Sequence, residues 1–329
     1  MSCSGALFKA DAGEVAHPRA VARPPADASR VAFDRAAMAR YVLSRRTPEG
    51  GYCYYRTPAW GVEEPDAPDT LAALMALRLL GVPPPEPAAT ARFLRSLQER
   101  DGGFPTLTIG WAALRGLDVL GFSPDRSPLA WLDRWHAVLL GPPRAGGARG
   151  AGGPPGPGEA RTWAVLLRDV LHLMELRRLD GSFPDDPGRA ATRELLAEAA
   201  DPSGGWARPE ADLETTGRAT RLAMAAGLAR DELEGAADLL GRCEDPVLGL
   251  RLTPGTGATA SGALWGGLVV AAALDARLRY PDAVAASLVE LQRPDGGLGR
   301  RHRAISTLDD TWRGLEAAAL FDQLEEEAR

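Results

Sequence analysis

Four short turns with the same pattern, two glycines followed by a bulky apolar or aromatic residue, recur along the chain. They are Gly50–Tyr52, Gly102–Phe104, Gly204–Trp206 and Gly296–Leu298. The first interval is 52 residues, and the next two, of 102 and 92 residues, are about twice as long. Degenerate turns around Gly152 and Gly249 fit into these two gaps. The spacing therefore predicts six repeated units of 46 to 52 residues.

Each unit predicts two helices of different character. The stretch before the glycines, such as Ala88–Arg100, carries charges and has apolar residues at helical spacing. Glycine ends this helix because it readily takes the left-handed conformation found at helix C-termini. The stretch after the turn begins at Ser, Thr or an acid and is rich in Ala and Leu almost all round. A helix that is apolar on every side is normally buried, so we expect the second helices inside and the first outside.

This alternation predicts an all-α fold, an (α/α)6 toroid of six helix pairs, with an open solenoid of helix pairs as the alternative. We expect one toroid domain over residues 31–323. Residues 1–30 are predicted to be a disordered or loosely draped arm, and residues 324–329 a C-terminal tail. The Gly- and Pro-rich residues 141–161 are predicted to be a flexible insertion in the third unit.

Charge and cysteine usage narrow the function classes. The formal net charge of −6 argues against nucleic acid as a partner. The three cysteines are scattered, with neither a disulfide framework nor a zinc-binding spacing, which favours a reducing compartment. No apolar run reaches the roughly 18 residues of a membrane span. We therefore expect a cytoplasmic protein that is not an integral membrane protein.

The units resemble a known repeat. In the second unit LQ…DGGF follows a helix, and in the first unit an inner helix begins with Asp-Thr. These features resemble the repeat of the prenyltransferase and squalene-oxidocyclase superfamily, over residues 31–321 and with four good copies out of six. The resemblance implies a toroid that encloses an apolar cavity for an isoprenoid, and it is specific for the fold rather than for the chemistry.

Aromatic residues occur where they could line such a cavity. Four lie near the starts of inner helices and four in turns expected at the same end: Trp111, Trp163, Trp265 and Trp312, and Tyr52, Trp60, Phe104 and Trp206. Aromatic faces bind isoprene units and stabilise carbocations. Bulky side chains that fill the wide end of a tapering barrel explain the same pattern, and the sequence leaves both interpretations open.

The stretch TLDDT at residues 307–311 resembles the Asp-X-Asp-Asp-Thr motif of class II, proton-initiated terpenoid cyclases, with Thr307 in place of the first Asp. The resemblance assigns Asp309 as the acid that protonates an alkene or epoxide, and Asp310 as the group that orients and tunes it. Such an acid must stay protonated in an apolar pocket beside a second carboxylate. Because acids are also common helix caps, we expect one of the two aspartates to be a cap.

Two other functions remain open. The first is a zinc-independent prenyl-diphosphate transferase or a prenyltransferase β-like subunit, which would need a partner protein. For that chemistry the candidate Mg²⁺ ligands at the rim are Asp69, Asp212 and Glu214. The candidate diphosphate-binding residues are Arg300, Arg301 and Arg303. Zinc is not expected, because the positions matching the zinc ligands of the β subunits are Thr259, Ser261 and Asp310. The second is a non-catalytic toroid that binds a lipid or a protein.

Overall fold

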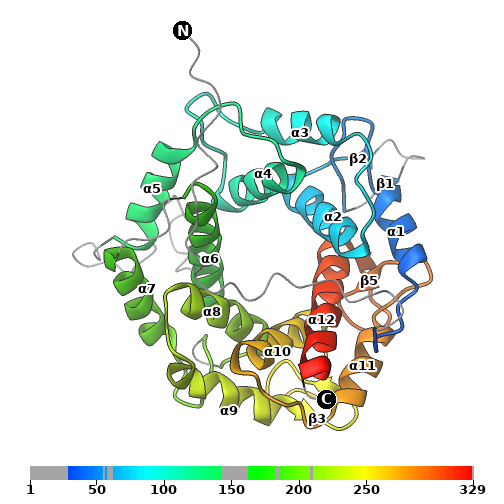
Figure 1. Cartoon of the computed structure of the whole chain (residues 1–329), viewed down its shortest axis with the longest axis vertical. Helices are drawn as coiled ribbons and strands as arrows, with labels where there is room; N and C mark the ends of the chain where they lie inside the picture. The colour runs from blue at the N-terminus through cyan, green and yellow to red at the C-terminus, as the bar shows by residue number, and fades with distance from the viewer. Residues whose placement is uncertain are drawn as a thin grey trace.

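The computed structural model describes residues 29–54, 56–57, 62–141, 162–181, 186–207 and 210–327. In these ranges six helices form an inner ring and six others surround them, alternating along the chain (Figure 1). The inner helices are α2 (Ala67–Leu80), α4 (Leu107–Leu120), α6 (Trp163–Leu179), α8 (Leu213–Ala225), α10 (Ser261–Leu274) and α12 (Leu308–Glu327). The outer helices are α1 (Arg35–Ser44), α3 (Pro87–Ser96), α5 (Leu129–Leu139), α7 (Asp186–Ala199), α9 (Glu234–Cys243) and α11 (Pro281–Glu290), with a short 3₁₀ helix (Arg230–Leu233) before α9.

The inner ring is closed. Each inner helix packs on the next one along the chain, and the last, α12, packs on the first, α2. The apolar core lies mainly between the two rings, where the Ala- and Leu-rich inner helices meet the outer ones. The structure thus confirms the predicted (α/α)6 toroid and rules out the open solenoid. In the described ranges, none of the helices combines the length and the apolar character needed to cross a membrane.

The glycines of the repeated turns explain how the units pack side by side. Gly50 has φ of +97°, and a Cβ there would lie 2.6 Å from the backbone of Ala89 in the next outer helix. Gly296, in the last unit, has φ of +94° and approaches the carbonyl oxygen of Ala37 in the first outer helix, where a Cβ would lie 2.3 Å away. Only glycine allows both the left-handed backbone and this close approach. The turn that ends one outer helix therefore packs on the following one, including across the closure of the ring.

A threonine in the inner helix fixes each of three turns. The backbone N–H that follows the two glycines donates to a threonine hydroxyl in the first, fourth and sixth units: Tyr52 to Thr70 at 2.9 Å, Trp206 to Thr216 at 3.0 Å and Leu298 to Thr311 at 2.9 Å. Because the bond recurs in the same position, the threonine of the Asp-Thr pattern has an architectural role.

Three short hairpins were not predicted by the repeat pattern. They are antiparallel pairs of two-residue strands in the loops before α2, α10 and α12: β1 (Arg56–Thr57) with β2 (Val62–Glu63), β3 (Glu244–Asp245) with β4 (Gly249–Leu250), and β5 (Leu298–Gly299) with β6 (Ser306–Thr307). Gly249, expected in a degenerate turn, has φ of +69°. The turn around Gly152, nearly all of the N-terminal arm and residues 142–161 of the insertion lie outside the described residues.

The predicted tail is wrong in part. Helix α12 continues through residues 324–327, and Leu324 is buried against the core. Arg30 donates its backbone N–H to a carboxylate oxygen of Asp322 at 2.9 Å and pairs with Glu325. The end of the last inner helix is therefore held by the chain segment that enters the first unit.

Helices α8 and α10 pack backbone against backbone, which leads to a test of the ring. A Cβ on Gly266 would lie 2.0 Å from the carbonyl oxygen of Leu213. We expect Gly266→Ala to lower the free energy of unfolding by about 2–3 kcal/mol, because overpacking forces the helices apart. Gly235→Ala in α9 is the matched control: its nearest neighbour is 3.5 Å away, and it should be neutral or stabilising by about 0.5–1 kcal/mol. Urea unfolding that shows equal effects of both substitutions would contradict this packing.

Candidate functional site

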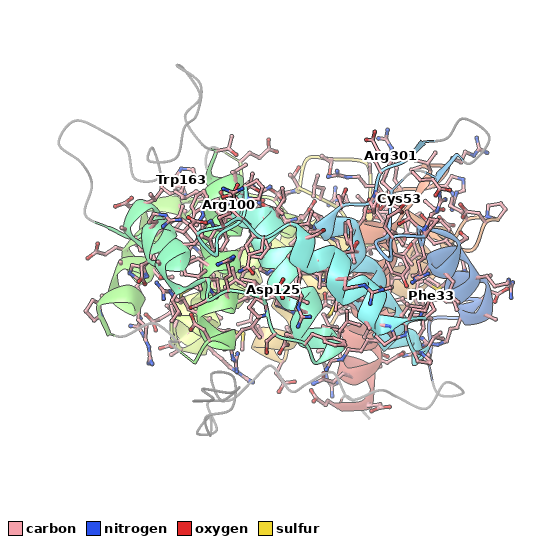
Figure 2. All side chains as sticks on the ribbon, turned by 90° about the horizontal axis from the view of Figure 1, so that it is seen from above. Phe33, Cys53, Arg100, Asp125, Trp163 and Arg301 are labelled. Atoms are coloured by element: carbon pink, nitrogen blue, oxygen red, sulfur yellow. The ribbon has the colours of Figure 1, made fainter. Side chains whose placement is uncertain are left out.

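The starts of several inner helices lie toward one rim of the ring. Figure 2 shows Trp163, at the start of α6, and Arg301, in the loop before α12, toward the same rim, above Phe33 and Asp125. Side-chain bonds join the starts of α8, α10 and α12 at this end: Ser261 contacts Asp310, and Glu214 contacts Arg300 and Arg313. The candidate acids of α12 therefore lie among residues from other units.

Neither aspartate of α12 caps the helix. The hydroxyl of Thr307 accepts the backbone N–H of Asp310 at 2.8 Å, so the prediction that an aspartate is the cap is wrong. In α2 and α8 the caps are Asp66 and Asp212, whose carboxylates accept backbone N–H groups at 2.7 and 2.8 Å. Threonine satisfies the helix start of α12, which leaves Asp309 and Asp310 available for other roles.

Asp310 is a buried acid at the seam between α10 and α12. It is 7% exposed. One carboxylate oxygen accepts the hydroxyl of Ser261 at 2.5 Å, and the other accepts the hydroxyl of Thr307 at 2.7 Å. Burial raises the pKa of Asp310, against the lowering effect of these two hydroxyl groups. Ser261 and Asp310, two of the three positions that match zinc ligands, thus meet, but they offer a hydroxyl and a carboxylate rather than a thiolate or imidazole.

Asp309 has the opposite environment. Its side chain is 52% exposed, and one oxygen accepts the Nε–H of Arg313 at 2.9 Å. Arg313 also reaches Glu214 of α8 at 2.7 Å. Helices α8 and α12 are not neighbours, because α10 lies between them and outer helices cover its far side. The Asp309–Arg313–Glu214 chain must therefore cross the ring interior.

A third acid, Asp69 of α2, was named from the sequence only as a metal ligand. It is 8% exposed, and its Oδ2 atom has no hydrogen-bond partner in the described structure. Burial, followed by the charges of Asp66 and Asp309, raises the pKa of Asp69 to about 7, against the lowering effects of a backbone hydrogen bond from Tyr54 and of the charge of Arg45. Asp69 directly precedes the threonine that fixes its turn, as Asp310 does in α12. The seam between α2 and α12 thus holds a carboxyl group whose pKa is raised toward neutral pH.

The ring interior is charged, which corrects the apolar cavity that the resemblance implies. Each of three glutamates bonds to an arginine of the interior: Glu214 to Arg218 at 2.6 Å and Arg313 at 2.7 Å, Glu316 to Arg221 at 2.8 Å, and Glu175 to Arg115 at 2.6 Å. Lone charges are costly away from water, whereas paired ones are tolerated. The side chains of this interior therefore include paired guanidinium and carboxylate groups.

Three of the predicted tryptophans lie in this interior. Trp111 and Trp312 stack at 6.4 Å between ring centroids, from α4 and α12 on either side of α2. Trp265 donates its Nε1–H to Glu316 at 2.7 Å and has the guanidinium of Arg221 4.8 Å from its ring centroid. The role of these three side chains in lining a cavity stays a prediction.

The other aromatics do not form one lining. Phe104 packs edge-on against Trp131 of α5 at 5.6 Å, and Trp206 donates its Nε1–H to Leu196 of α7, so both belong to the wall between the rings. Tyr52 is fully buried in the core, and burial raises the pKa of its hydroxyl to about 12. Their assignment to the cavity is therefore wrong. Trp163 is half-buried at the start of α6. Trp60 lies outside the described residues.

The predicted magnesium and diphosphate residues are only partly assembled. Asp212 is a helix cap and Glu214 is paired with arginines. Among the described residues, no group of three or more His, Cys, Asp or Glu side chains could hold a metal ion, so Asp69, Asp212 and Glu214 do not form a shared site. Arg300, Arg301 and Arg303 are exposed, and Arg300 lies 3.5 Å from Glu214.

The interior arginines Arg115, Arg218, Arg221 and Arg313 were missed by sequence reasoning. One signal was present: Glu214 precedes Arg218, and Asp309 precedes Arg313, by the four residues that pair charges on one helix face. The pairs between units, such as Glu214 with Arg313, required the closed ring.

No protein-family model matches the chain. Over 183 residues the chain is 28% identical to a curated protein, the drimenyl diphosphate synthase of Streptantibioticus cattleyicolor. The match covers 47% of this chain and 34% of that protein, so the chain spans about a third of that relative's length.

Solved structures share the fold at low identity. Protein geranylgeranyltransferase-I of Candida albicans, complexed with GGPP, matches with a TM-score of 0.61 and 13% identity over 88% of this chain and 92% of that one. The type II terpene cyclase MstE from Scytonema matches with a TM-score of 0.53 and 16% identity over 89% and 97%. A possible GH105 family member from Salmonella enterica matches with a TM-score of 0.52 and 12% identity over 89% and 94%. These likenesses bear out the toroid, and the site must supply the chemistry.

Proposed function

We propose that this chain is a proton-initiated terpenoid cyclase of the class II kind, acting on an isoprenoid with an anionic head group such as a prenyl diphosphate. The observation that carries the proposal is the pair of buried acids with raised pKa values, Asp69 and Asp310, in the same group of carboxyls as Asp309. The sequence similarity to a drimenyl diphosphate synthase and the fold shared with a type II terpene cyclase support the same chemistry.

In this proposal Asp309 is the proton donor, because its side chain reaches the ring interior where a substrate would lie. Asp310 is held by two hydroxyl groups and orients the pair. Asp69 supplies the additional carboxyl that Thr307 removes from the motif. After burial, the charge of Asp309 is among the causes that raise the pKa of both Asp69 and Asp310, since like charges cannot all ionise cheaply.

The proton passes from the carboxyl of Asp309 to one carbon of a terminal alkene, and the other carbon becomes a cation. Trp111 and Trp312 then offer aromatic faces that stabilise positive charge. Arg313 holds Asp309 in an ion pair in this structure. The guanidinium groups of the ring interior are well suited to phosphate oxygens. They favour a substrate with a phosphate-like head.

Product analysis tests the proposal. The purified protein would be incubated with C10, C15 and C20 prenyl diphosphates and with squalene, with and without Mg²⁺. We expect a cyclic product that keeps its diphosphate. Release of free diphosphate that depends on Mg²⁺ would instead support a prenyl-diphosphate transferase or a β-like subunit. Binding of isoprenoids without turnover would support a lipid-binding toroid.

A further inference from the structure

The ring interior contains a buried histidine that has no part in the proton donation proposed for Asp309. His172 of α6 is 7% exposed, and its Nδ1 atom has no hydrogen-bond partner in the described structure. A buried polar atom without a partner destabilises the folded state. Its imidazole stacks on the indole of Trp111, with 3.8 Å between centroids and 10° between planes. A phenyl ring could make the same stack without the unpaired atom, so packing alone does not account for the imidazole.

The surroundings of His172 keep its ring neutral. Burial holds the pKa of His172 well below its ordinary value. Arginines from four inner helices lower it further by their charge, namely Arg168, Arg218, Arg115 and Arg313. Arg168 pairs with Asp169, and Glu175 on the same helix pairs with Arg115. The convergence of four helices on one side chain puts His172 in the ring interior. A neutral imidazole with an unpaired nitrogen offers a lone pair there.

We propose that His172 is the base that ends the cyclisation. The inference rests on the proposed function. The Nδ1 lone pair takes a proton from the carbon next to the final cationic centre, and the electrons of that C–H bond form the alkene of the product. One proton has entered from the carboxyl of Asp309 and one has left to the imidazole, so substrate and product are isomers. The resulting imidazolium returns its proton to the aspartate through solvent, and no other reactant is needed.

The weak basicity of this imidazole is compatible with the role. An alkyl cation is a far stronger acid than any imidazolium, so proton loss to His172 is downhill even beside arginines. A base that stays neutral is also needed before that step, because an imidazolium stacked on Trp111 would repel the migrating positive charge. The stack joins the base to the aromatic pair Trp111 and Trp312 along which the cation is stabilised.

His172→Phe and His172→Gln test the inference, with His136→Phe in the outer helix α5 as the control. Each variant would be incubated with the prenyl diphosphate that the wild type cyclises, and both substrate consumption and product composition would be measured. The Phe variant keeps an aromatic ring against Trp111 but has no lone pair. The Gln variant keeps polarity without a comparable base and provides a second measurement if the Phe variant folds poorly.

We expect both His172 variants to consume substrate within about threefold to tenfold of the wild-type rate, because protonation by Asp309 is retained. The share of the wild-type alkene should fall at least about fivefold, replaced by alcohols from capture of the cation by water or by isomeric alkenes. An unchanged alkene share in both variants would overturn the role of His172 while leaving the cyclase proposal intact. Absence of a cyclic product from the wild type would overturn both.

Discussion

Asp309→Asn is expected to lower the rate of cyclisation by about 10³–10⁴-fold, the upper part of the range for loss of a general acid. The amide keeps the size of the carboxyl but cannot donate a proton to an alkene. Asp310→Asn should have a smaller effect, about 10–100-fold, because an amide can still accept one of the two hydroxyl bonds from Ser261 and Thr307. The measurement is the initial rate of cyclic product formation with saturating prenyl diphosphate.

Asp118→Asn is the matched control for both substitutions. Asp118 is an exposed aspartate near the C-terminal end of the inner helix α4, and we expect a rate within about twofold of the wild type. Full activity of Asp309→Asn would contradict its assignment as the donor. Full activity of that variant together with loss in Asp69→Asn would move the donor to α2.

The second large expected effect is a change in the free energy of unfolding with pH. Asp69 has a pKa raised to about 7 in the folded protein, so the folded state binds more protons than the unfolded state between about pH 4 and pH 7. The free energy of unfolding is therefore highest at low pH, where this carboxyl is protonated in both states. It falls as the pH rises from about 4 to about 7. This one group is expected to lower the free energy of unfolding by about 4 kcal/mol between pH 4 and pH 8.

Asp69→Asn should remove this dependence. The variant is expected to match the wild type near pH 4 and to be more stable near pH 8 by up to about 4 kcal/mol. Denaturant unfolding at several pH values measures both curves. Asp118→Asn should leave the wild-type curve unchanged. Parallel curves for the wild type and Asp69→Asn would show that Asp69 ionises with its ordinary pKa. That result would contradict a buried acid of raised pKa at the α2–α12 seam.

The fold was largely predictable because its determinants are local and repeated. The left-handed glycine at Gly50 and its counterpart at Gly296 mark where outer helices end, and the threonines Thr70 and Thr311 mark where inner helices are fixed. The hairpins before α2, α10 and α12 were missed because two-residue strands leave almost no sequence pattern. The continuation of α12 through Leu324 depends on burial against the core.

The site was predicted less well because it depends on closure of the ring. The bond between Glu214 and Arg313 joins residues 99 positions apart, and the bond between Trp111 and Glu175 joins residues 64 apart. Local spacing cannot specify such pairs. The same limitation hid the raised pKa of Asp69, which burial, then the charge of Asp66 and less strongly that of Asp309 from the other end of the chain produce. Asp309 and Asp310 were predicted as candidate acids, with one of them expected to cap the helix, whereas Thr307 is the cap.

The reaction carried out in D₂O tests the central claim most directly. Protonation by an aspartate whose proton exchanges with solvent should place one deuterium on the alkene carbon that becomes saturated, in a cyclic product that retains its diphosphate. Mass spectrometry and NMR of the product measure the amount and the position of the label. A cyclic product without deuterium at that carbon, or one that has lost diphosphate, would contradict initiation by the aspartates of α12.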